Sequence, residues 1–462
     1  MSKQFKFMLD ESNIPKAWYN INADMPVHLA PVLHPATKKP VNPNSPSPFL
    51  PMSLHSQDVS TERWIEIPAP IRDIYKLWRP TPMFRAHRLE RMLDTPAHIY
   101  YKYEGVSPVG SHKANTAVAQ AFYNKEAGTK ALTAETGAGQ WGAALAMACH
   151  FFNLACQVYM VKVSYHQKPY RRILMQTYGA EVYASPSDRT SYGRSVLKTD
   201  PDCPGSLGIA GSEAIEAAFL SGGSARIAVG GGEHNFVTIH QSVIGLEALK
   251  QMEMADEYPD IIIACVGSGS NLGGFSYPFL HQTLTQGRQT RFIAVEPAAC
   301  PTMTKGRYTF DYEDTGGMGP IMKMYTLGHS FIPPGIHAGG LRYHGLSPSV
   351  SALVANGYIE ARAVHQVSVF NAAVQFARVE GILPAPESAH AIRVAIDEAL
   401  KCKETGEAKV IAFCLSGHGH FDMSAYQAYN EGALEDCGYP EEAIAKALTE
   451  LPAIPEFYGG ER

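Results

Sequence analysis

The strongest constraint on this chain is a repeated alternation of short apolar segments with helical patterns, which begins near residue 97. The first expected strands lie at 97–104, 130–135, 156–163 and 180–185, and the expected helices between them lie at 115–128, 139–152 and 169–179. Strands that are apolar along their whole length are buried on both faces, as in parallel sheets covered by helices. The pattern therefore predicts an α/β fold.

A second series of the same kind follows residue 260. Its expected strands lie at 261–267, 291–297 and 409–417, with helices after 267 and at 365–379 and 386–401. Two series predict two parallel-sheet α/β domains, with a ligand in the crevice at the carboxyl ends of the strands. We expect an N-terminal domain over 79–250, with a mobile subdomain near 130–225, and a C-terminal domain over 251–462.

The first 78 residues are expected to form an extended N-terminal segment. Prolines are dense at 31–51, and such a density excludes regular helix or central strand over residues 1–60. Trp18, Phe49 and Leu50 are apolar anchors that disordered tails rarely carry. The segment should therefore wrap over the body of the protein, and a disordered tail is the alternative.

Composition excludes several classes of protein. The net charge of −5 does not suit a nucleic-acid binder. The eight cysteines form no CxxC pair, so they predict reduced thiols in a cytoplasmic protein. The start of the chain lacks the apolar region of a signal peptide. The longest apolar stretch, 143–161, is interrupted by polar residues, and we expect a helix, a turn and a strand there, with no membrane partner.

Two candidate loops stand before helices of the first series. In Gly110–Lys113, Ser111 can cap the next helix, and Lys113 then lies in its first turn, where the helix dipole and burial both disfavour an ammonium. A neutral lysine can form a Schiff base, although a surface lysine is the alternative.

In the loop 134–140, glycines let backbone N–H groups approach a carboxylate. If Glu135 is partly buried, its pKa is raised and it is suited to acid–base catalysis. The alternative is that its carboxylate caps the next helix.

Two further candidate loops follow strands of the second series. The loop 267–274 is rich in glycine and serine at a helix start, which predicts a phosphate cup, and it lacks a P-loop lysine. A dinucleotide site is the alternative there, with Glu296 as the acidic residue.

In the loop 415–422, the Ser416 hydroxyl could bond a neutral pyridine nitrogen. His418, His420 and Asp422 resemble a metallohydrolase motif, but no further ligand follows, so we expect no metal.

Together the four loops favour pyridoxal 5′-phosphate, which needs a lysine, a phosphate cup and a partner for its ring nitrogen. The same residues carry a family resemblance from about residue 8 to 425. The matching segments are GSHKANTAVAQA (110–121), AETGAGQWG (134–142), CVGSGSNLGG (265–274), EGILPAPESAHA (380–391) and LSGHG (415–419). The chain resembles the tryptophan synthase β chain, and LWRPTP (77–82) and IHAGGLRYHG (336–345) are similar to its second, divergent type.

The resemblance implies pyridoxal-phosphate fold type II and a role for each site residue. Lys113 would bind the cofactor and move the substrate α-proton, and Glu135 would act at the leaving hydroxyl and steer indole. The substrate carboxylate would be held by Thr136, Gly137, Ala138, Gly139 and Gln140. The cofactor would be held by His112, Gln140, Gly267, Ser268, Gly269, Ser270, Asn271 and Ser416, with Glu380 near its ring.

The resemblance also implies the reaction, a β-replacement that joins L-serine and indole to give L-tryptophan and water, with indole salvage as one role. It implies a homodimer, weak or absent coupling to an α chain, and a monovalent cation as a further cofactor. The donor could also be phosphoserine or another β-substituted amino acid. A serine or threonine dehydratase of this fold is one alternative, although dehydratases usually carry an SxGN-type loop. A non-catalytic, regulatory β-like subunit is another.

Four features depart from the family pattern. Ser268 replaces a glycine, which should crowd the phosphate cup, and Trp141 replaces the histidine of the common β chain, although the divergent type shares this tryptophan. The stretch 221–241 is unusually rich in glycine and could alter the indole side of the site. Arg362 lies near the place of a closing aspartate in the common type, which puts ordinary domain closure in doubt.

Overall fold

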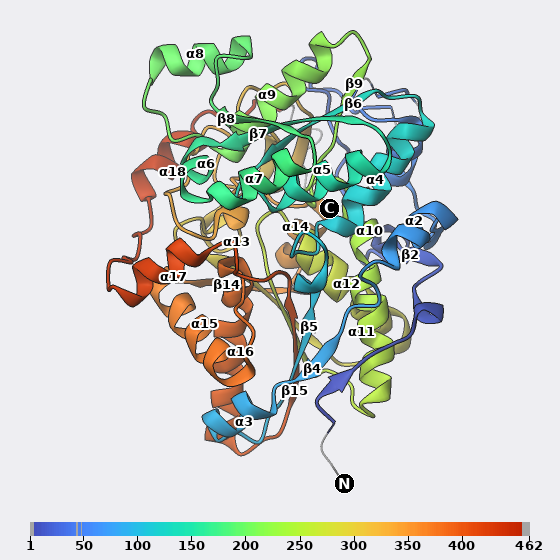
Figure 1. Cartoon of the computed structure of the whole chain (residues 1–462), viewed down its shortest axis with the longest axis vertical. Coiled ribbons are helices and arrows are strands. Elements are labelled where there is room, and N and C mark those ends of the chain that lie inside the picture. Colours follow the sequence, from blue (N-terminus) through green and yellow to red (C-terminus); the bar gives the residue numbers. More distant parts are fainter. Residues whose placement is uncertain (1–3, 43–44, 48, 455–462) are drawn as a thin grey trace.

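The computed structural model describes residues 4–42, 45–47 and 49–454, and two sheets organise it (Figure 1). The larger sheet has seven strands in the order β1-β4-β5-β15-β10-β11-β14, and the smaller has four in the order β8-β7-β6-β9. The larger sheet consists of β1 (Lys6–Phe7), β4 (Met83–Arg85), β5 (His98–Tyr103), β10 (Ile261–Cys265), β11 (Arg291–Pro297), β14 (Glu360–Val364) and β15 (Val410–Leu415). The smaller consists of β6 (Ala131–Thr136), β7 (Ala155–Val161), β8 (Glu181–Ser185) and β9 (Ala225–Ile227). Both sheets are largely parallel, as expected.

The larger sheet includes two strands, β4 and β5, from residues that the sequence assigns to the first domain, and β5 is the one that the sequence predicts as a strand. β5 pairs in parallel with β15 and antiparallel with β4, so it lies with the strands of residues 251–462. The expectation that residues 79–250 supply one separate sheet is therefore wrong at this strand. The apolar pattern identifies β5 as buried on both faces, but a pattern within one strand does not identify its neighbours. The domain limits themselves stay predictions.

The smaller sheet spans residues 131–227, which is the region of the predicted subdomain. Its pairs β6–β7, β7–β8 and β6–β9 are all parallel. The expected strand at 156–163 ends early, because residues from Lys162 form a short helix. A separate sheet here agrees with a subdomain, and the predicted mobility stays a prediction.

Helices cover both sheets. They are α1 (Met52–Val59), α2 (Ala69–Tyr75), α3 (His87–Leu93), α4 (Ala114–Glu126), α5 (Gln140–Phe151), α6 (Lys162–Gln167), α7 (Pro169–Thr177), α8 (Ser191–Thr199), α9 (Leu207–Leu220), α10 (Asn235–Gln241), α11 (Val243–Met254), α12 (Ser270–Gln286), α13 (Thr302–Lys305), α14 (Pro348–Ala355), α15 (Gln366–Glu380), α16 (Pro386–Thr405), α17 (Met423–Asn430) and α18 (Glu441–Leu448). α16 packs on β15 and β10 and against α15, while α12 also contacts β10. Hairpin β12 (Arg307–Tyr312) and β13 (Ile321–Thr326) lies outside both sheets.

The N-terminal segment wraps over the body, as predicted for the residues that are described. β1 adds an antiparallel edge to the larger sheet, and β2 (Ala17–Tyr19) pairs with β3 (Trp64–Glu66). Trp18 and Leu50 are buried. The expectation that residues 1–60 contain no regular helix is wrong, because α1 begins after Pro51, where the missing proline N–H costs the helix nothing. Residues 43, 44 and 48 of the proline-rich stretch lie outside the described residues.

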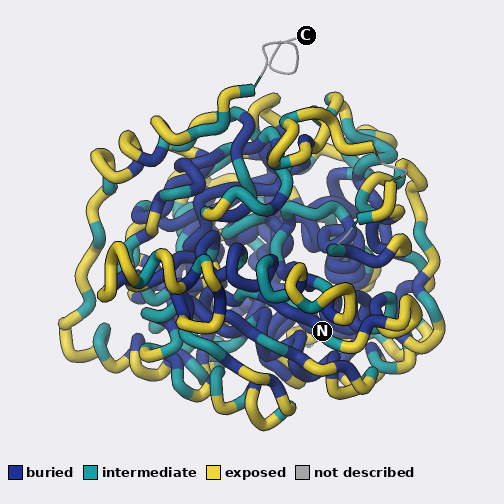
Figure 2. The backbone as a smooth tube through the Cα atoms, turned by 90° about the horizontal axis from the view of Figure 1, so that it is seen from above, coloured by how far each residue is buried: buried dark blue, intermediate teal, exposed yellow. Residues whose placement is uncertain are grey.

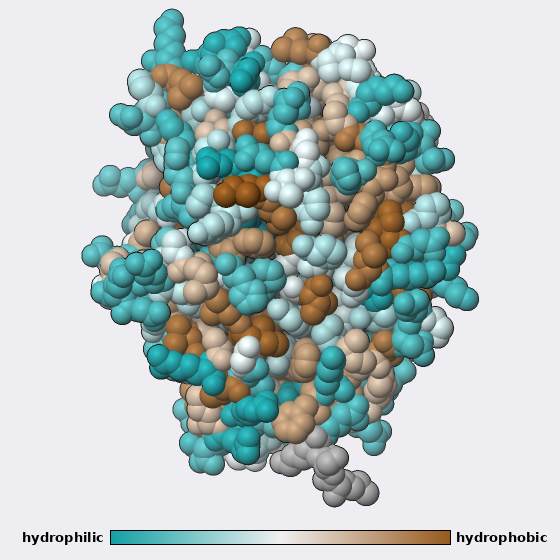
Figure 3. Space-filling view, in the orientation of Figure 1, coloured by the Kyte–Doolittle hydropathy of each residue, from teal (hydrophilic) through white to brown (hydrophobic). Residues whose placement is uncertain are grey.

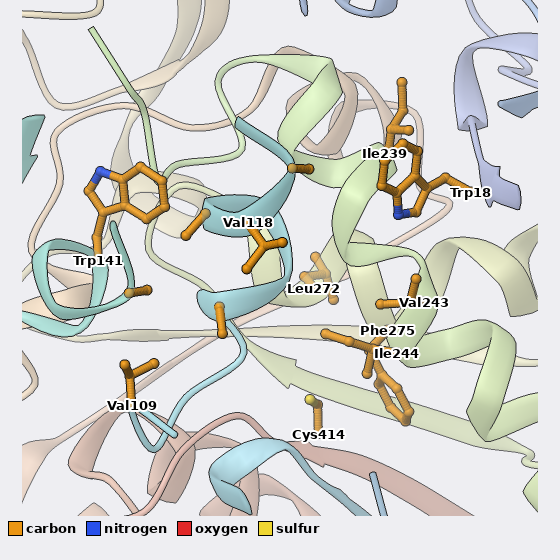
Figure 4. Close-up of a cluster of buried hydrophobic side chains, with 14 of the residues drawn as sticks. Trp18, Val109, Val118, Trp141, Ile239, Val243, Ile244, Leu272, Phe275 and Cys414 are labelled. Carbon is orange, nitrogen blue, oxygen red and sulfur yellow. The ribbon is translucent and has the colours of Figure 1, made fainter. Parts of the chain in front are cut away.

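The largest hydrophobic core joins the two sheets (Figure 4). Val118 of α4, Trp141 of α5, Ile244 of α11 and Phe275 of α12 all belong to it. Buried backbone accordingly fills the interior, and exposed backbone lies at the periphery (Figure 2). On the face in Figure 3, apolar residues gather in small groups between hydrophilic ones. None of the described helices is both long and apolar enough to cross a bilayer.

Candidate active site

The four predicted loops converge on one cavity between the two sheets. The cavity has a volume of about 830 Å³, part of it open to solvent. Residues of all four loops line it, including Lys113, Glu135, Gly269 and Ser416. Loops at the carboxyl ends of parallel strands meet at the same edge of a sheet, which explains this convergence of distant segments. Arg171, Leu207, Gly230, Tyr343 and Glu387 also line the cavity, and sequence reasoning missed all of them.

Lys113 stands immediately before α4, at the N-cap position. Its Nζ donates to Ser270 Oγ at 2.8 Å and to the Gly230 carbonyl. Burial lowers the pKa of Lys113 to about 8, although Glu233 and Glu135 oppose the shift. Ser111 does not cap the helix as predicted, because its hydroxyl has no partner among the described residues. The lowered pKa leaves a larger neutral fraction of Lys113 near neutral pH than an ordinary lysine has, which favours a Schiff-base nucleophile.

Glu135 lies near the end of β6 and faces the same cavity as Lys113. Burial, together with the neighbouring carboxylates Glu233 and Glu313, raises the pKa of Glu135 to about 8. α5 begins at Gly139, and no side chain caps it, so the alternative that Glu135 caps this helix is wrong. A carboxyl group with a pKa near the working pH can both give and accept a proton.

Residues at the start of α5 line the cavity, and the sequence predicts that their backbone N–H groups bind a carboxylate. Gly139 is its N-cap and has a φ of +97°, a conformation that glycine adopts without strain. A Cβ on Gly137 would lie 2.7 Å from the Gly339 carbonyl, so the loop passes close to a segment of the other sheet's domain. Gly142 N donates to Thr136 Oγ1 at 3.1 Å and shapes the turn. Free N–H groups at a helix start suit a carboxylate.

The start of α12 repeats this construction. Gly269 is the N-cap with a φ of +114°, and a Cβ on Gly267 would lie 2.5 Å from the Gly340 carbonyl. Asn271 Nδ2 donates to the Cys265 carbonyl at 3.1 Å, and His112 Nε2 lies 3.3 Å from Ser270 Oγ. Burial and Lys113 hold the pKa of His112 well below its usual value, so its ring is neutral. Residues of this helix start line the cavity, and their role as a phosphate cup stays a prediction.

Ser416 closes the cavity from the end of β15. Its Oγ lies 2.8 Å from Ser388 Oγ and 3.7 Å from Cys265 Sγ, and the residue is buried. A hydroxyl held by neutral neighbours can donate to an unprotonated ring nitrogen. The predicted site residues 112–113, 135–138, 140, 267–271 and 416 thus line one cavity, and Gly139 lies beside it as the N-cap of α5.

Glu380 is the exception among the predicted site residues. Its carboxylate accepts hydrogen bonds from Leu89 N at 2.8 Å and Arg88 N at 3.1 Å, so it stabilises the start of α3 outside the cavity. The prediction that Glu380 lies near a cofactor ring is therefore wrong. Glu387, in the first turn of α16, faces the cavity instead, and its Oε1 accepts from Gly340 N at 2.9 Å. Glu387 follows Pro386 at a helix start, a signal that could have identified it.

Arg171 of α7 is the second important residue that the sequence analysis missed. It is fully buried and lines the cavity, and its three guanidinium nitrogens make no hydrogen bond within the described part of the chain. Its nearest carboxylate is Asp422 at 3.7 Å, and Asp422 also pairs with buried Lys168. The Asp422 carboxylate thus lies between two cations, Lys168 and Arg171. It is therefore not available to bind a metal together with His418 and His420. The described residues contain no cluster of three or more potential metal ligands.

Two other sequence features lie away from the cavity. Glu296 accepts hydrogen bonds from Met303 N at 2.7 Å and Thr304 N at 2.8 Å, so it stabilises α13 and does not face the loop 267–274. The alternative of a dinucleotide site in that loop therefore lacks its acidic residue. Arg362, on edge strand β14, pairs with Glu398 at 2.6 Å. Arg362 is not among the described residues that line the cavity.

Comparisons with known proteins agree with this geometry. Residues 74–417 match the model of the family described as pyridoxal-phosphate dependent enzyme. The chain is 56% identical over 433 residues to tryptophan synthase beta chain 2 of Methanosarcina mazei, covering 94% of this chain and 98% of that one. It is 58% identical over 434 residues to the protein of the same name from Aquifex aeolicus, covering 93% and 100%.

The chain belongs to the family of tryptophan synthase β chains, second type. Its fold is pyridoxal-phosphate fold type II, and a crystal structure of a threonine deaminase has the same fold. That structure has a TM-score of 0.53, covers 73% of this chain and 92% of its own, and is 18% identical. The resemblance inferred from the loops of this β chain is therefore confirmed.

Proposed function

We propose that this protein is a pyridoxal-phosphate-dependent lyase that joins L-serine and indole to give L-tryptophan and water. The observation that carries the proposal is the meeting of Lys113, Glu135 and two glycine-capped helix starts in one cavity. The names of the relatives support the same reaction. The family supports pyridoxal phosphate as the resident cofactor.

The residues around the cavity fit that cofactor. His112 Nδ1, Asn271 Oδ1 and Glu387 Oε2 are buried without partners among the described residues, and all three residues line the cavity. Buried polar atoms are rarely left unsatisfied, so these atoms favour a polar ligand. His112 and residues 267–271 would hold the phosphate, Lys113 the aldehyde carbon, and Ser416 the ring nitrogen. When bound, the cofactor supplies an electron sink for bond breaking at Cα and Cβ.

The chain's own residues would then handle protons and orientation. Lys113, with its lowered pKa, can accept the α-proton of the amino acid and return it. Glu135, protonated below about pH 8, can give a proton to the leaving hydroxyl, and as a carboxylate it can accept one from indole. The N–H groups at the start of α5 would hold the substrate carboxylate. A neutral Ser416 would not force protonation of the ring, which favours replacement at Cβ over transamination.

Phosphoserine is a second candidate donor, because one observation favours an anionic leaving group. Arg171 brings a buried guanidinium without hydrogen bonds, among the described residues, to the cavity, and guanidinium groups bind phosphate bidentately. Comparing kcat/KM for L-serine and phosphoserine would separate the two donors. If Arg171→Lys lowered kcat/KM for both donors equally, the phosphoserine candidate would be rejected.

Absorbance spectra of the purified protein test the main proposal. A cofactor band should be present before substrate, change with L-serine, and return as tryptophan forms on addition of indole. Ketoacid without tryptophan would favour a dehydratase instead. Function unchanged by Lys113→Ala would favour a non-catalytic subunit. Absence of any cofactor band after adding pyridoxal phosphate would overturn the proposal.

Finer features of the proposal rest on the family resemblance. We expect a homodimer, weak or absent binding of an α chain, and a monovalent cation that raises activity. Light scattering, titration with an α chain, and assays in potassium against tetramethylammonium salts would test each. All eight cysteines are free, and seven are buried, which supports a reducing, cytoplasmic location.

A further inference from the structure

A second cavity extends from the catalytic one on the Glu135 side. It has a volume of about 390 Å³, and Glu135, Leu207 and Tyr343 line both cavities. Ile215 and Ile227 contribute to its apolar wall. An apolar extension that begins at the acid–base carboxyl can receive the ring of the indole proposed above.

The opposite wall of this second cavity is acidic. Glu233, His234 and Glu313 line it. His234 Nδ1 lies 2.9 Å from Asp58 Oδ2, and its Nε2 lies 3.3 Å from Glu313 Oε2. Burial alone would lower the pKa of His234, but these carboxylates raise it well above its usual value, so His234 is a cation between two anions.

Glu233 is the carboxyl on this wall that is left without a close ion pair among the described residues. Glu313 and Asp58 share His234, and Asp314 accepts from Ser212 Oγ at 2.6 Å and Gly319 N at 2.8 Å. Burial raises the pKa of Glu233 to about 7, and the charges of His234 and Lys113 oppose the shift without cancelling it. A carboxyl in this position is available to a ligand in the cavity.

The turn that presents Glu233 is held against the phosphate cup. Gly232 N donates to Ser268 Oγ at 3.0 Å, and a Cβ on Gly232 would lie 2.8 Å from Ser270 N. A Cβ on Gly230 would lie 2.4 Å from the Trp141 ring. Ser268 and the glycine-rich stretch 221–241 are two of the departures from the family pattern, and they meet here through Gly232 and Ser268.

We infer that Glu233 is a specificity-determining residue that selects indoles carrying a hydrogen-bond donor, such as an amino group, over indoles carrying a carboxylate. The inference rests on the proposed function, since it assumes that the second cavity receives the indole. The carboxylate of Glu233 would accept a hydrogen bond from an amino substituent and repel a carboxylate substituent. Glu135 keeps the acid–base role proposed above.

A competition assay tests the inference. Holoenzyme, L-serine, and equal amounts of each aminoindole and the matching indolecarboxylate are mixed, and the two products are counted at low conversion. We expect the amino product to exceed the carboxylate product by about tenfold or more in the wild type. Glu233→Gln should bring the ratio towards one. Because both substrates share one enzyme, partial unfolding does not change the ratio.

Three further variants make the test specific. Glu216→Gln, on α9 but outside the cavity, should keep the wild-type ratio, since Glu216 accepts from Ser191 N and Tyr192 N at the start of α8. Ser268→Ala should lower the ratio partly, because it frees the turn. An unchanged ratio in Glu233→Gln, or a loss of selectivity only in Glu313→Gln, would overturn the assignment.

Calorimetric binding of the same indoles without an amino-acid donor provides a readout apart from activity. The wild type should bind aminoindoles more tightly than indolecarboxylates, and Glu233→Gln should not. If the wild type makes no tryptophan from indole, the proposed function fails, while the binding preference still reports on Glu233. Tryptophan formation with equal binding of both indole classes would overturn only the inference.

Discussion

The starts of α5 and α12 have the same local structure but follow strands of different sheets, and they differ in their hydrogen bonds to neighbouring segments. Each follows a buried strand and begins at a glycine with positive φ and no side-chain cap. The α12 loop is braced by neighbouring segments: Ser268 accepts from Ser347 N at 2.8 Å and from Gly232 N at 3.0 Å. The α5 loop packs closely on Gly339 and Arg171, but its side-chain hydrogen bond, from Gly142 N to Thr136 Oγ1, stays within the loop.

This difference matches the two ligands proposed for these helix starts. A cofactor that stays bound gains from a rigid cup, because a preformed site loses little entropy on binding. An amino acid that enters and leaves in each cycle is better served by a loop on the smaller sheet, where fewer segments hold it. The following changes would break or sharpen this comparison.

The largest effect is expected at Lys113, which bonds to the first turn of α12. Lys113→Ala should lower kcat by more than about 10³-fold, because the nucleophile and the acceptor of the α-proton are both removed. Pyridoxal phosphate should still bind through the α12 cup, measurable by equilibrium dialysis. Complete loss of cofactor binding would mean that the start of α12 cannot hold the cofactor without Lys113.

Removing the acid–base group on the α5 side should have the next largest effect. Glu135→Gln keeps the size of the side chain and should lower the rate of tryptophan formation by about 10²–10⁴-fold. Cofactor affinity should be unchanged, since Glu135 lies on the other sheet. The measurement is steady-state kinetics beside a cofactor titration, and a parallel loss in both would contradict the division of roles.

A matched pair of alanine variants compares the two helix starts directly. Gly269→Ala and Gly139→Ala each place a Cβ at positive φ, at a cost of about 1–2 kcal/mol. We expect Gly269→Ala to weaken cofactor binding and Gly139→Ala to raise KM for serine, each by about tenfold or more. If both variants weakened only the cofactor, the assignment of α5 to the carboxylate would be wrong.

The pH dependence of stability isolates Glu135 without any activity assay. The pKa of Glu135 is about 8 in the folded chain against 4.5 as its usual value. Between these values the unfolded chain has lost the proton and the folded chain keeps it, so stability falls as pH rises from about 4.5 through about 8. Glu135→Gln removes this loss. Thermal unfolding of the cofactor-free protein should show the variant gaining at least about 1 kcal/mol on wild type between pH 5 and pH 9.

The smallest effect is expected far from both helix starts. Arg362 is partly exposed and pairs with Glu398 on the larger sheet's edge. Arg362→Ala should change the free energy of unfolding by no more than about 1 kcal/mol and leave kinetics unchanged. A large rise in KM for serine would show that β14 takes part in domain closure, and that the site depends on a third region besides the starts of α5 and α12.

Much of the site could be predicted from the residues alone. The expected strand at 291–297 agrees with β11, and the starts of α5 and α12 follow from their glycines and the buried strands before them. These features depend on chemistry within about ten residues. Periodicity, capping and backbone freedom are local, and a chain segment carries them wherever it is placed.

Other features depended on which distant segments meet. β5 pairs with β15, more than three hundred residues later, because sheet pairing is decided by the whole fold. Glu387 rather than Glu380 faces the cavity, since α16 and not the end of α15 borders it. Arg171 reaches the site by the packing of α7. Glu233 lies in the glycine-rich stretch 221–241 that the sequence marks as unusual, but the sequence does not show which of its residues faces the cavity. The sequence thus determined the loops that carry the chemistry, while tertiary contacts decided which side chains surround them, because burial and charge pairing exist only after the segments are packed together.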